Sequence, residues 1–347
     1  MITDSRTGGM ILKVTLAIVG SLVLALGVFY AWATSGSYPR ENYTDILTYD
    51  IDSSGADGSG VDGSDEKGKR LSLVSYNIGY LSGLTNLEAV KRPRTLFDDN
   101  LAQVIANVRP INADIIAFQE IDIDSKRSYN VNQLEAVANG LGLAKAGLAI
   151  NWNKNYVPFP YWPISAHFGK IVSGQAVLSR YPITENQRIV LDKVASRPFF
   201  YNAVYLDRLA QVTKVDIEGQ PLMVINIHLE AFDNPTRFQQ TRAVRTMAET
   251  YAKDYPVVLV GDFNSAVNRP EEGDRSIEIM TESKLFAPAL AKDQWPSQPT
   301  FPSEPPKHKL DYLFYTPATI ELNDTRVVTE VGTASDHLPL MITFTLK

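Results

Sequence analysis

The chain has 347 residues, of which 44% are hydrophobic, so it is large enough for one large core or two modest ones. Lys and Arg total 33 against 39 Asp and Glu, and the net charge of −6 argues weakly against tight nonspecific binding to nucleic acid or anionic lipid. The chain has no cysteine, which excludes disulfides, thiolate metal sites and a cysteine nucleophile. Any metal ion would therefore bind oxygen or imidazole ligands.

A stretch of 20 uncharged residues, VTLAIVGSLVLALGVFYAWA, runs from Val14 to Ala33 and is long enough to cross a bilayer as a helix. Arg6 and Lys13 precede it, whereas residues 41–66 carry eight acids and no base. Because positive charge stays on the cytoplasmic side, this asymmetry predicts a cytoplasmic N-terminus. We therefore interpret residues 1–35 as a short cytoplasmic segment and a transmembrane signal anchor, with the rest of the chain outside the cytoplasm.

The same residues allow a second interpretation. Ala31-Trp32-Ala33 has the small-x-small form of a signal-peptidase site, and cleavage there would make the protein secreted. The apolar stretch is long for a signal peptide, which favours an uncleaved anchor in the cell membrane. Both interpretations predict an exported domain.

Residues 53–69 read SSGADGSGVDGSDEKGK, a composition typical of a flexible acidic linker. The spaced aspartates resemble a calcium loop only faintly, since the ordered ligands and closing Glu of an EF-hand are missing. We place the linker at residues 36–70 and a single catalytic domain at residues 71–347.

Short β-rich segments alternate with amphipathic helices after the linker. Apolar periodicity predicts strands at 71–78, 114–119, 175–179, 199–205, 209–217, 222–227, 257–260, 310–315, 320–330 and 338–344. It predicts helices at 97–108, 132–141, 236–251 and 276–285. Glu218-Gly219-Gln220-Pro221 is interpreted as a hairpin turn, and the aromatic and proline-rich residues 152–168 as a loop. The pattern predicts one α/β domain in which helices cover mostly antiparallel sheets.

Polar residues recur where these strands begin or end. Each one alone is typical of a turn or a cap, but together they form six signals in one order. These residues are Asn77 in SYNIG, Glu120 in AFQE, His228 in INIHL, Asp262 and Asn264 in GDFN, Asp311 in LDYLFY, and Asp336 and His337 in SDHLPL.

With these blocks, and with SGQAVLSRYPI between them, the sequence resembles the endonuclease/exonuclease/phosphatase superfamily. That group contains deoxyribonuclease I, abasic-site endonucleases, neutral sphingomyelinases and inositol-polyphosphate 5-phosphatases. The blocks cover residue 71 to the end in the family's order, and GDFN with a terminal SDH is a specific combination. The resemblance implies a four-layer α/β sandwich with two central, mostly antiparallel β-sheets flanked by helices, which agrees with the predicted strands.

The resemblance also implies a metal-dependent hydrolysis of phosphate esters. In-line attack needs a deprotonated water, neutralised phosphoryl oxygens and a stabilised leaving oxygen. Glu120 offers the hard carboxylate that Mg²⁺ prefers and would be the main metal ligand, with Asp336 as the second. Mn²⁺ is the expected substitute for Mg²⁺.

The remaining roles follow from the same resemblance. Asp262 would orient or deprotonate the attacking water, and Asn264 would donate its amide to a phosphate oxygen. Asn77 would support Glu120 and the phosphate. His337 would act as the acid-base residue, with its tautomer fixed by Asp311, and His228 would donate to the phosphoryl oxygen as charge develops.

Two basic residues stay open as substrate-binding candidates. Arg180 in LSRYP either contacts phosphate or braces the turn through a carboxylate. His167, in ISAHFGK, precedes the block that reaches Arg180. The aromatic residues 152–168 are either a flap over a satellite core or a lip that binds substrate or lipid.

The sequence therefore predicts a phosphodiesterase acting outside the cytoplasm on a membrane-proximal or small phosphoester substrate. The first alternative is an extracytoplasmic endonuclease that cuts DNA or RNA, which the net charge does not favour. The second is a catalytically silent binding module on the same fold. A serine hydrolase is set aside because the sequence lacks a G-x-S-x-G elbow. No protein partner can be inferred.

Overall fold

The computed structural model describes residues 4–51, 69–267 and 276–347. The linker predicted at residues 53–69 lies outside these ranges except for its last residue. Two β-sheets form the centre of the body, and both are built almost entirely from segments with alternating or continuous apolar residues.

Among the described residues, the first sheet has seven strands in the order β1-β4-β5-β3-β2-β13-β12. Their bounds are Thr44–Thr48 (β1), Lys145–Val157 (β4), Gly169–Ser179 (β5), Ile115–Asp122 (β3), Arg70–Asn77 (β2), Leu340–Leu346 (β13) and Ile320–Val327 (β12). β2 and β3 pair in parallel, whereas the other neighbours are antiparallel. Helix α2 (Arg94–Val108) supplies the crossover that a parallel pair requires.

The second sheet has six strands in the described part of the chain, in the order β10-β11-β9-β8-β7-β6. Their bounds are Ala287–Pro288 (β10), Asp311–Tyr315 (β11), Val257–Asp262 (β9), Gln220–His228 (β8), Leu209–Ile217 (β7) and Ile183–Val190 (β6). Its parallel pair is β8 and β9, joined by helix α5 (Asn234–Tyr251). Each sheet therefore has one parallel pair at its centre, and the carboxyl ends of such a pair lie at one edge of the sheet.

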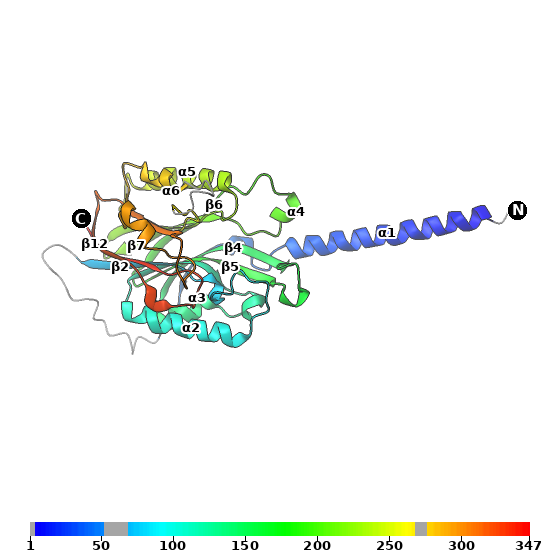
Figure 1. Ribbon diagram of the computed structural model, residues 1–347, viewed down its shortest axis with the longest axis horizontal. Coiled ribbons are helices and arrows are strands. Elements are labelled where there is room, and N and C mark those ends of the chain that lie inside the picture. The colour runs from blue at the N-terminus through cyan, green and yellow to red at the C-terminus, as the bar shows by residue number, and fades with distance from the viewer. Residues whose placement is uncertain (1–3, 52–68, 268–275) are drawn as a thin grey trace.

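The two sheets stack face to face, with α2 and α3 (Gln133–Leu141) on one outer side and α5 and α6 (Ser276–Thr281) on the other (Figure 1). This confirms the predicted four-layer α/β sandwich. One apolar core fills the space between the sheets and under α5 and α6, and a second lies between the first sheet and α2 and α3.

A group of buried amides also lies between the sheets. Gln119 Nε2 donates to Asn226 Oδ1 at 2.6 Å, and Asn226 Nδ2 donates back to the carbonyl oxygen of Phe118 at 2.9 Å. Gln175 Nε2 donates to the carbonyl of Asn226 at 2.8 Å. Because buried amides must be paired, these bonds fix the position of one sheet on the other.

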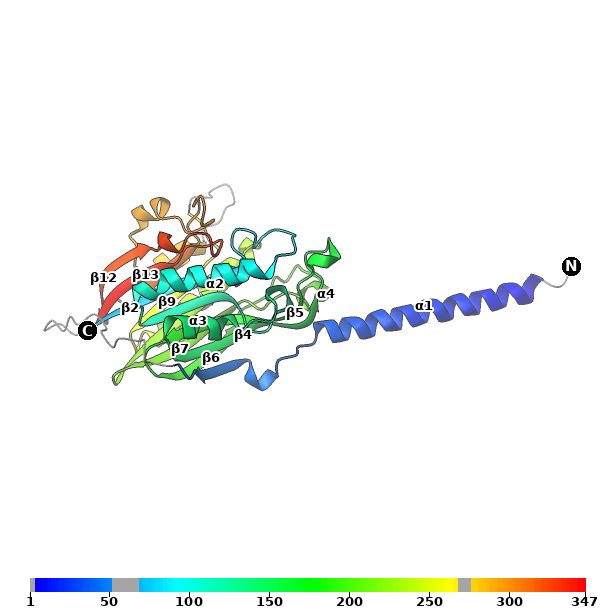
Figure 2. The same cartoon turned by 90° about the horizontal axis from the view of Figure 1, so that it is seen from below.

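Helix α1 (Asp4–Thr34) projects from one end of the body as an isolated rod (Figures 1 and 2). Its segment Gly9–Thr34 is long and apolar enough to cross a membrane, and the most apolar window has no buried residue. Length and composition alone are consistent with either a signal sequence or an anchor.

Several predicted elements differ from the structure. Residues 199–205, predicted as a strand, contain the short helix α4 (Phe199–Asn202) and a turn, because Pro198 begins the helix and Phe199 and Phe200 stay exposed. The stretch 152–168, predicted as a loop, begins with the last six residues of β4. The helix predicted at 276–285 ends at Thr281.

The beginning of the predicted linker is also structured. Residues Thr44–Thr48 form β1, which pairs antiparallel with β4 at the edge of the first sheet. The acid-rich composition of residues 41–66 concealed this strand, because its buried and exposed residues do not alternate cleanly. The folded body therefore includes residues upstream of the boundary that we predicted at residue 71.

Candidate active site

The carboxyl ends of the two parallel strand pairs meet at one edge of the sandwich. Asn77 is the last residue of β2, and Glu120 lies near the end of β3. His228 and Asp262 are the last residues of β8 and β9 and are direct register partners. Asp311 begins β11 opposite Asp262. Strand order alone thus brings residues from five distant parts of the sequence into one place.

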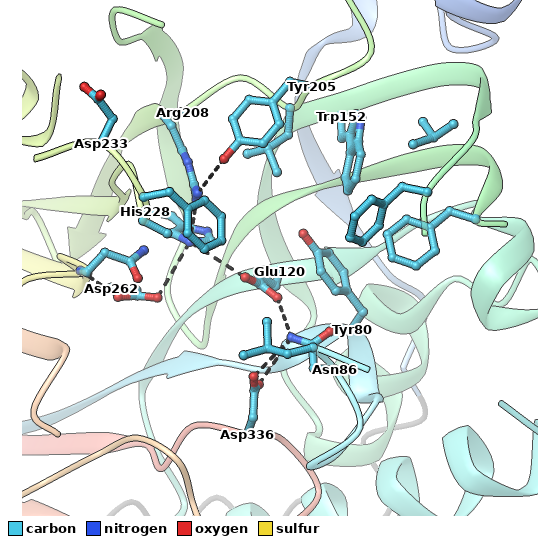
Figure 3. Close-up of a pocket in the computed structure, with 18 of the residues that line it drawn as sticks. Tyr80, Asn86, Glu120, Trp152, Tyr205, Arg208, His228, Asp233, Asp262 and Asp336 are labelled. Atoms are coloured by element: carbon cyan, nitrogen blue, oxygen red, sulfur yellow. Dashed lines mark hydrogen bonds and ion pairs between the residues drawn. The ribbon is translucent and has the colours of Figure 1, made fainter. Parts of the chain in front are cut away.

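These residues surround a pocket of about 1040 Å³ (Figure 3). Six of the predicted site residues line it, and the pocket is also lined by residues that the sequence analysis did not single out. The predicted residues in its wall are Glu120, His228, Asp262, Asn264, Asp336 and His337.

Asp262 is the residue on which the polar contacts converge. Its Oδ2 accepts the amide of Asn77 at 3.0 Å and lies 3.6 Å from His228 Nε2 and 3.7 Å from His337 Nε2. Its Oδ1 accepts the backbone N–H of Asn264 at 2.8 Å. Burial raises the pKa of Asp262 to about 6, although the charge of His337 opposes this rise. The carboxylate is thus a base at neutral pH with a pKa close to the working range.

His337 and Asp311 form a pair. His337 Nδ1 lies 2.9 Å from Asp311 Oδ2, which leaves Nε2 directed toward Asp262. Burial lowers the pKa of His337, but the charges of Asp311 and Asp262 outweigh it and raise this pKa well above its usual 6.5. The imidazole is therefore protonated at neutral pH and can donate a proton from Nε2.

Glu120 and Asp336 lie on the other side of the pocket. Asn86 Nδ2 lies 3.1 Å from Glu120 Oε2 and 3.3 Å from both carboxylate oxygens of Asp336, so the two carboxylates converge on one amide (Figure 3). Burial raises the pKa of Glu120, and it raises that of Asp336 to about 6. A partly buried and a buried carboxylate that share one neutral donor form an electron-rich site with hard oxygen ligands.

A second group of described residues also has its ligand atoms close together. Asp262, Asp311 and His337 each offer one ligand atom, and these atoms all lie within 4.8 Å of one another. This group is a possible metal site, although the Nδ1 of His337 already has Asp311 as its hydrogen-bond partner.

Strained backbone occurs at the site. Glu120 and Asn264 both have positive φ, 54° and 51°, a conformation that is costly for residues other than glycine. Gly79, which follows Asn77 by two residues, also has φ of +54°, and a Cβ there would lie 2.6 Å from Asp336 Oδ1. The glycine in SYNIG therefore allows the chain to pass close to the carboxylate.

Two predicted contacts differ from the geometry. Asn77 was expected to support Glu120, but its amide holds Asp262 and its Oδ1 accepts the N–H of Gly79 at 3.1 Å. His228 was expected to donate from its ring, but its Nε2 lies 2.6 Å from Arg208 Nη1 and can only accept there. Burial, helped by the charge of Arg208, lowers the pKa of His228 well below 6.5, so the ring is neutral.

Neither substrate-binding candidate lies in the pocket. Arg180 Nε donates to Asp114 Oδ1 at 3.0 Å and its Nη2 donates to Asn112 Oδ1 at 2.7 Å, so it braces a turn. That turn is at the amino end of β3, opposite to Glu120. His167 Nδ1 lies 2.6 Å from the hydroxyl of Tyr156, beside the pocket rather than in its wall.

Sequence reasoning missed Arg208, which is only 4% exposed and lines the pocket. Besides contacting His228, it donates from Nη2 to the hydroxyl of Tyr205 at 3.2 Å, and its Nε lies 3.5 Å from Glu230 Oε2. It provides a buried positive charge beside the reactive carboxylates. No sequence signal marks it, since a basic residue before an apolar strand is common.

A second basic residue in the wall is Arg127, which the sequence analysis also missed. It makes two bonds to Asp122, of 3.0 Å from Nε and 2.8 Å from Nη2. Its guanidinium lies 3.4 Å from the centre of the Tyr80 ring and within 5.2 Å of the ring centres of Trp152 and Phe168. These contacts give one side of the pocket a rigid aromatic wall.

Two stacked sheets with a buried carboxylate and imidazole site at their shared edge define a hydrolase architecture. The family model described as "Endonuclease/Exonuclease/phosphatase family" matches residues 74–337. The chain belongs to that family and is a phosphoester hydrolase of it. No curated protein sequence matches the chain.

Solved structures agree on the fold. An endonuclease/exonuclease/phosphatase from Beutenbergia cavernae is 20% identical in sequence, with a TM-score of 0.63. The match covers 80% of this chain and 72% of the Beutenbergia chain. The human Nocturnin catalytic domain with bound sulfate is 15% identical with a TM-score of 0.55, covering 90% and 100%. The Bacteroides thetaiotaomicron mannosyl-6-phosphatase is 17% identical with a TM-score of 0.55, covering 79% and 99%.

Proposed function

We propose that the chain is a Mg²⁺-dependent phosphodiesterase, tethered to the cell membrane by α1, that acts outside the cytoplasm on a membrane-proximal or small phosphoester. The observation that supports this best is that Glu120, Asp262 and His337 share one pocket although 217 residues separate the first from the last in the sequence. A deprotonated base, a protonated imidazole and a hard-oxygen site are the three elements that in-line hydrolysis of a phosphate ester requires.

The metal would bind at Glu120 and Asp336. Asp336 is buried and Glu120 partly buried, and both carboxylates have raised pKa values and converge on the amide of Asn86. The neutral amide does not balance their negative charge, which a bound dication would do. When bound, Mg²⁺ neutralises charge on the phosphoryl oxygens and on the leaving oxygen. Mn²⁺, which accepts similar ligands, would substitute for it.

The protein side chains account for the other steps. Asp262 accepts a proton from the attacking water, while Asn77 and Asn264 hold its two oxygens in place. Arg208 provides charge for a phosphoryl oxygen and keeps His228 neutral. His337, held by Asp311, donates the proton from Nε2 that stabilises the oxyanion.

Charge asymmetry supports the proposed location. Arg6 and Lys13 lie before the apolar segment and eight acids with no base follow it in residues 41–66, which favours export of the body. Cleavage after Ala33 would give a secreted form instead. Protease protection of the N-terminal segment in sealed vesicles, together with the mass of the mature chain, distinguishes the two.

The test uses the full chain in detergent with bis(p-nitrophenyl) phosphate, with Mg²⁺ or with EDTA. We expect hydrolysis only with Mg²⁺, and a loss of roughly 10²-fold or more in Glu120→Ala and His337→Ala. Glu321→Ala, which removes an exposed carboxylate on β12, should keep full activity. Metal-independent turnover, or full activity in both site variants, would contradict the proposal.

A panel of substrates separates this function from its alternatives. Plasmid DNA and RNA test the endonuclease alternative, and a sugar phosphate tests monoester hydrolysis, the activity named for the Bacteroides phosphatase of similar fold. Cleavage of nucleic acid alone would replace the proposed substrate class. Absence of both Mg²⁺ binding in calorimetry and hydrolysis across the panel would favour the silent binding module.

A further inference from the structure

Large apolar side chains are exposed around the mouth of the pocket, where a soluble surface would carry polar ones. They come from the segment after β4, from α4 and from the loop after β8, and each is 50–79% exposed. We call this group the docking rim. It consists of Phe159, Tyr161, Trp162, Ile164, Phe199, Phe200 and Phe232.

The docking rim adjoins the active site. Phe159, Tyr161 and Phe232 line the pocket, as does Tyr201 of α4, whereas Trp162 and Phe199 are not among its lining residues. An exposed apolar patch of this kind marks an interaction surface rather than a random distribution of hydrophobic residues. Any surface that covers the docking rim therefore faces the catalytic groups.

Contacts fix the end of α1 beside the docking rim. Lys154 Nζ donates to the carbonyl of Thr34 at 3.0 Å, and the backbone N–H of Asn155 donates to the carbonyl of Ser35 at 2.8 Å. The next residue, Tyr156, has its ring centre 5.8 Å from that of Phe29 and its hydroxyl 2.6 Å from His167 Nδ1. The chain thus leaves the apolar helix directly at the base of the segment that carries the docking rim.

The arrangement of the elements agrees with these contacts. In both ribbon views α4 lies at the end of the body from which α1 projects (Figures 1 and 2). A bilayer spanned by α1 would lie at that same end. Only residues 35–43 separate α1 from β1, a reach of about 30 Å when fully extended, so the body cannot move far from such a bilayer.

The chemistry of the docking rim fits a lipid interface. Trp, Tyr and Phe are the residues that anchor proteins at the boundary between head groups and acyl chains. Although the chain has a net charge of −6, neither residues 152–170 nor residues 193–206 contain an acid. These segments contain four bases, Lys154, Lys170, Lys193 and Arg197. Lys170 and Lys193 are paired with Asp124 and Asp207, however, and Glu230 and Asp233 flank Phe232. The apolar side chains, rather than local charge, therefore suit the docking rim to a bilayer.

We propose that the docking rim inserts into the interface of the bilayer that α1 spans, so that the pocket opens onto lipid head groups. Naming head-group phosphodiesters as substrate rests on the proposed hydrolysis, whereas insertion of the rim rests only on α1 spanning the bilayer. In the reaction, the water oxygen bonds to phosphorus, the P–O bond to one alcohol breaks, and a proton ends on the released alcohol.

The first experiment measures insertion directly. The full chain is reconstituted into phosphatidylcholine and phosphatidylglycerol vesicles, with or without bromine on the acyl chains. Subtracting the emission of Trp162→Phe isolates Trp162 from the other three tryptophans of the chain. We expect blue-shifted emission from Trp162 that bromine reduces about twofold. Water-like emission that bromine leaves unchanged would overturn the proposal.

The second experiment compares two substrates, vesicle phospholipid and soluble bis(p-nitrophenyl) phosphate. The variant Trp162→Ser with Phe199→Ser and Phe200→Ser removes rim residues that do not line the pocket. We expect it to lose about tenfold on vesicle lipid and to stay within about twofold on the soluble diester. Leu285→Ser is the matched control, since this 43% exposed residue lies near β10, away from the site.

The outcomes separate the two proposals. Equal losses of activity on both substrates would overturn the proposal that the docking rim inserts into lipid, because they would show a defect in the pocket rather than at the membrane interface. Failure of the unaltered chain to hydrolyse either substrate with Mg²⁺ would refute the proposed function. In that case the bromine experiment still decides whether the docking rim inserts.

Discussion

A single oxygen, Oδ2 of Asp262, has three polar neighbours: the amide of Asn77 and the Nε2 atoms of His228 and His337. The two rings differ in charge, because burial and Arg208 keep His228 neutral whereas Asp311 and Asp262 keep His337 protonated. Two imidazoles within 4 Å of the same oxygen thus have different protonation states. The neighbouring side chains, rather than the residue type, decide which ring can supply a proton.

These pKa shifts predict a bell-shaped pH dependence of kcat/KM. Below about pH 6 Asp262 gains a proton and stops acting as a base, so activity falls as the pH decreases. At high pH His337 loses its proton, and activity falls again. The charge of Asp311 raises both pKa values. In Asp311→Asn both limbs should therefore move to lower pH, with kcat reduced by roughly 10²-fold or more.

The measurement is a pH–rate profile on a soluble diester at saturating Mg²⁺. Asp324→Asn removes an exposed carboxylate on β12 and should leave both limbs in place. An Asp311→Asn profile with unmoved limbs would show that Asp311 does not act through Asp262 and His337.

The sequence predicted the site residues that lie at strand ends but not all of those that lie in the segments between the strands. Glu120, His228 and Asp262 each follow an apolar strand, and the strand register brings them together. Arg208 and Asn86 reach the pocket through contacts with residues far away in the sequence, so no local pattern marks them. The assignment of residues 199–205 as a strand also hid the loop that leads to Arg208.

At the scale of elements, the parallel pair β8 and β9 depends on one glycine. Gly261 in GDFN has φ of +137°, and a Cβ there would lie 2.0 Å from the carbonyl oxygen of Ile227. Because that atom belongs to the backbone of a buried strand, it cannot move aside cheaply. The glycine thus allows β9 to approach β8 and brings Asp262 beside His228.

Gly261→Ala should therefore destabilise the body by more than about 4 kcal/mol, because both the contact and the backbone conformation are unfavourable. Gly219, in the turn between β7 and β8, also has positive φ, +93°, but nothing lies within 4 Å of its Cβ position. Gly219→Ala should cost only about 1 kcal/mol. Thermal unfolding of both variants tests this difference, and equal losses would show that the contact with Ile227 is unimportant.

Helices with a clear apolar period were predicted well, whereas the edge strands β1, β6 and β10 and the long inner strand β4 were not predicted. Helix α3 begins after Asn132, whose side chain accepts from the N–H of Glu135, and it ends before Gly142. These caps are visible in the sequence. The edge strands β1 and β6 expose part of both faces and carry polar residues, so their pattern resembles that of a loop.

At the scale of the molecule, the connection between α1 and the body is short, and the side chain of Asn153 makes three of its hydrogen bonds. Asn153 Oδ1 accepts the N–H groups of Ser37 and Tyr38 at 3.0 and 3.1 Å, and its Nδ2 donates to the carbonyl of Tyr38 at 2.9 Å. Asn153 thus satisfies three backbone groups that would otherwise be unpaired. The helix and the body are coupled through this residue together with its neighbours Lys154 and Asn155.

Asn153→Ala should release this connection while the body stays folded. Arg40, which is exposed and two residues beyond Tyr38, then becomes a better site for trypsin. The lost hydrogen bonds should lower the local stability of this segment by about 1–2 kcal/mol. We therefore expect a fragment beginning at Glu41 to appear several times faster than from the unaltered chain. Asn107→Ala, within α2, is the control and should not change this rate. Equal rates in all three proteins would mean that Asn153 does not hold the connection.

The amides between the sheets have a consequence for how the halves of the site stay aligned. Glu120 belongs to one sheet, whereas His228 and Asp262 belong to the other. Two apolar faces can slide over each other at little cost, but the bonds of Gln119 and Gln175 to Asn226 can form in only one relative position. Gln119 lies one residue before Glu120 in β3, and Asn226 lies two residues before His228 in β8. The distance between the proton acceptor and the carboxylate ligand is therefore set by a polar layer next to the site as well as by the apolar core.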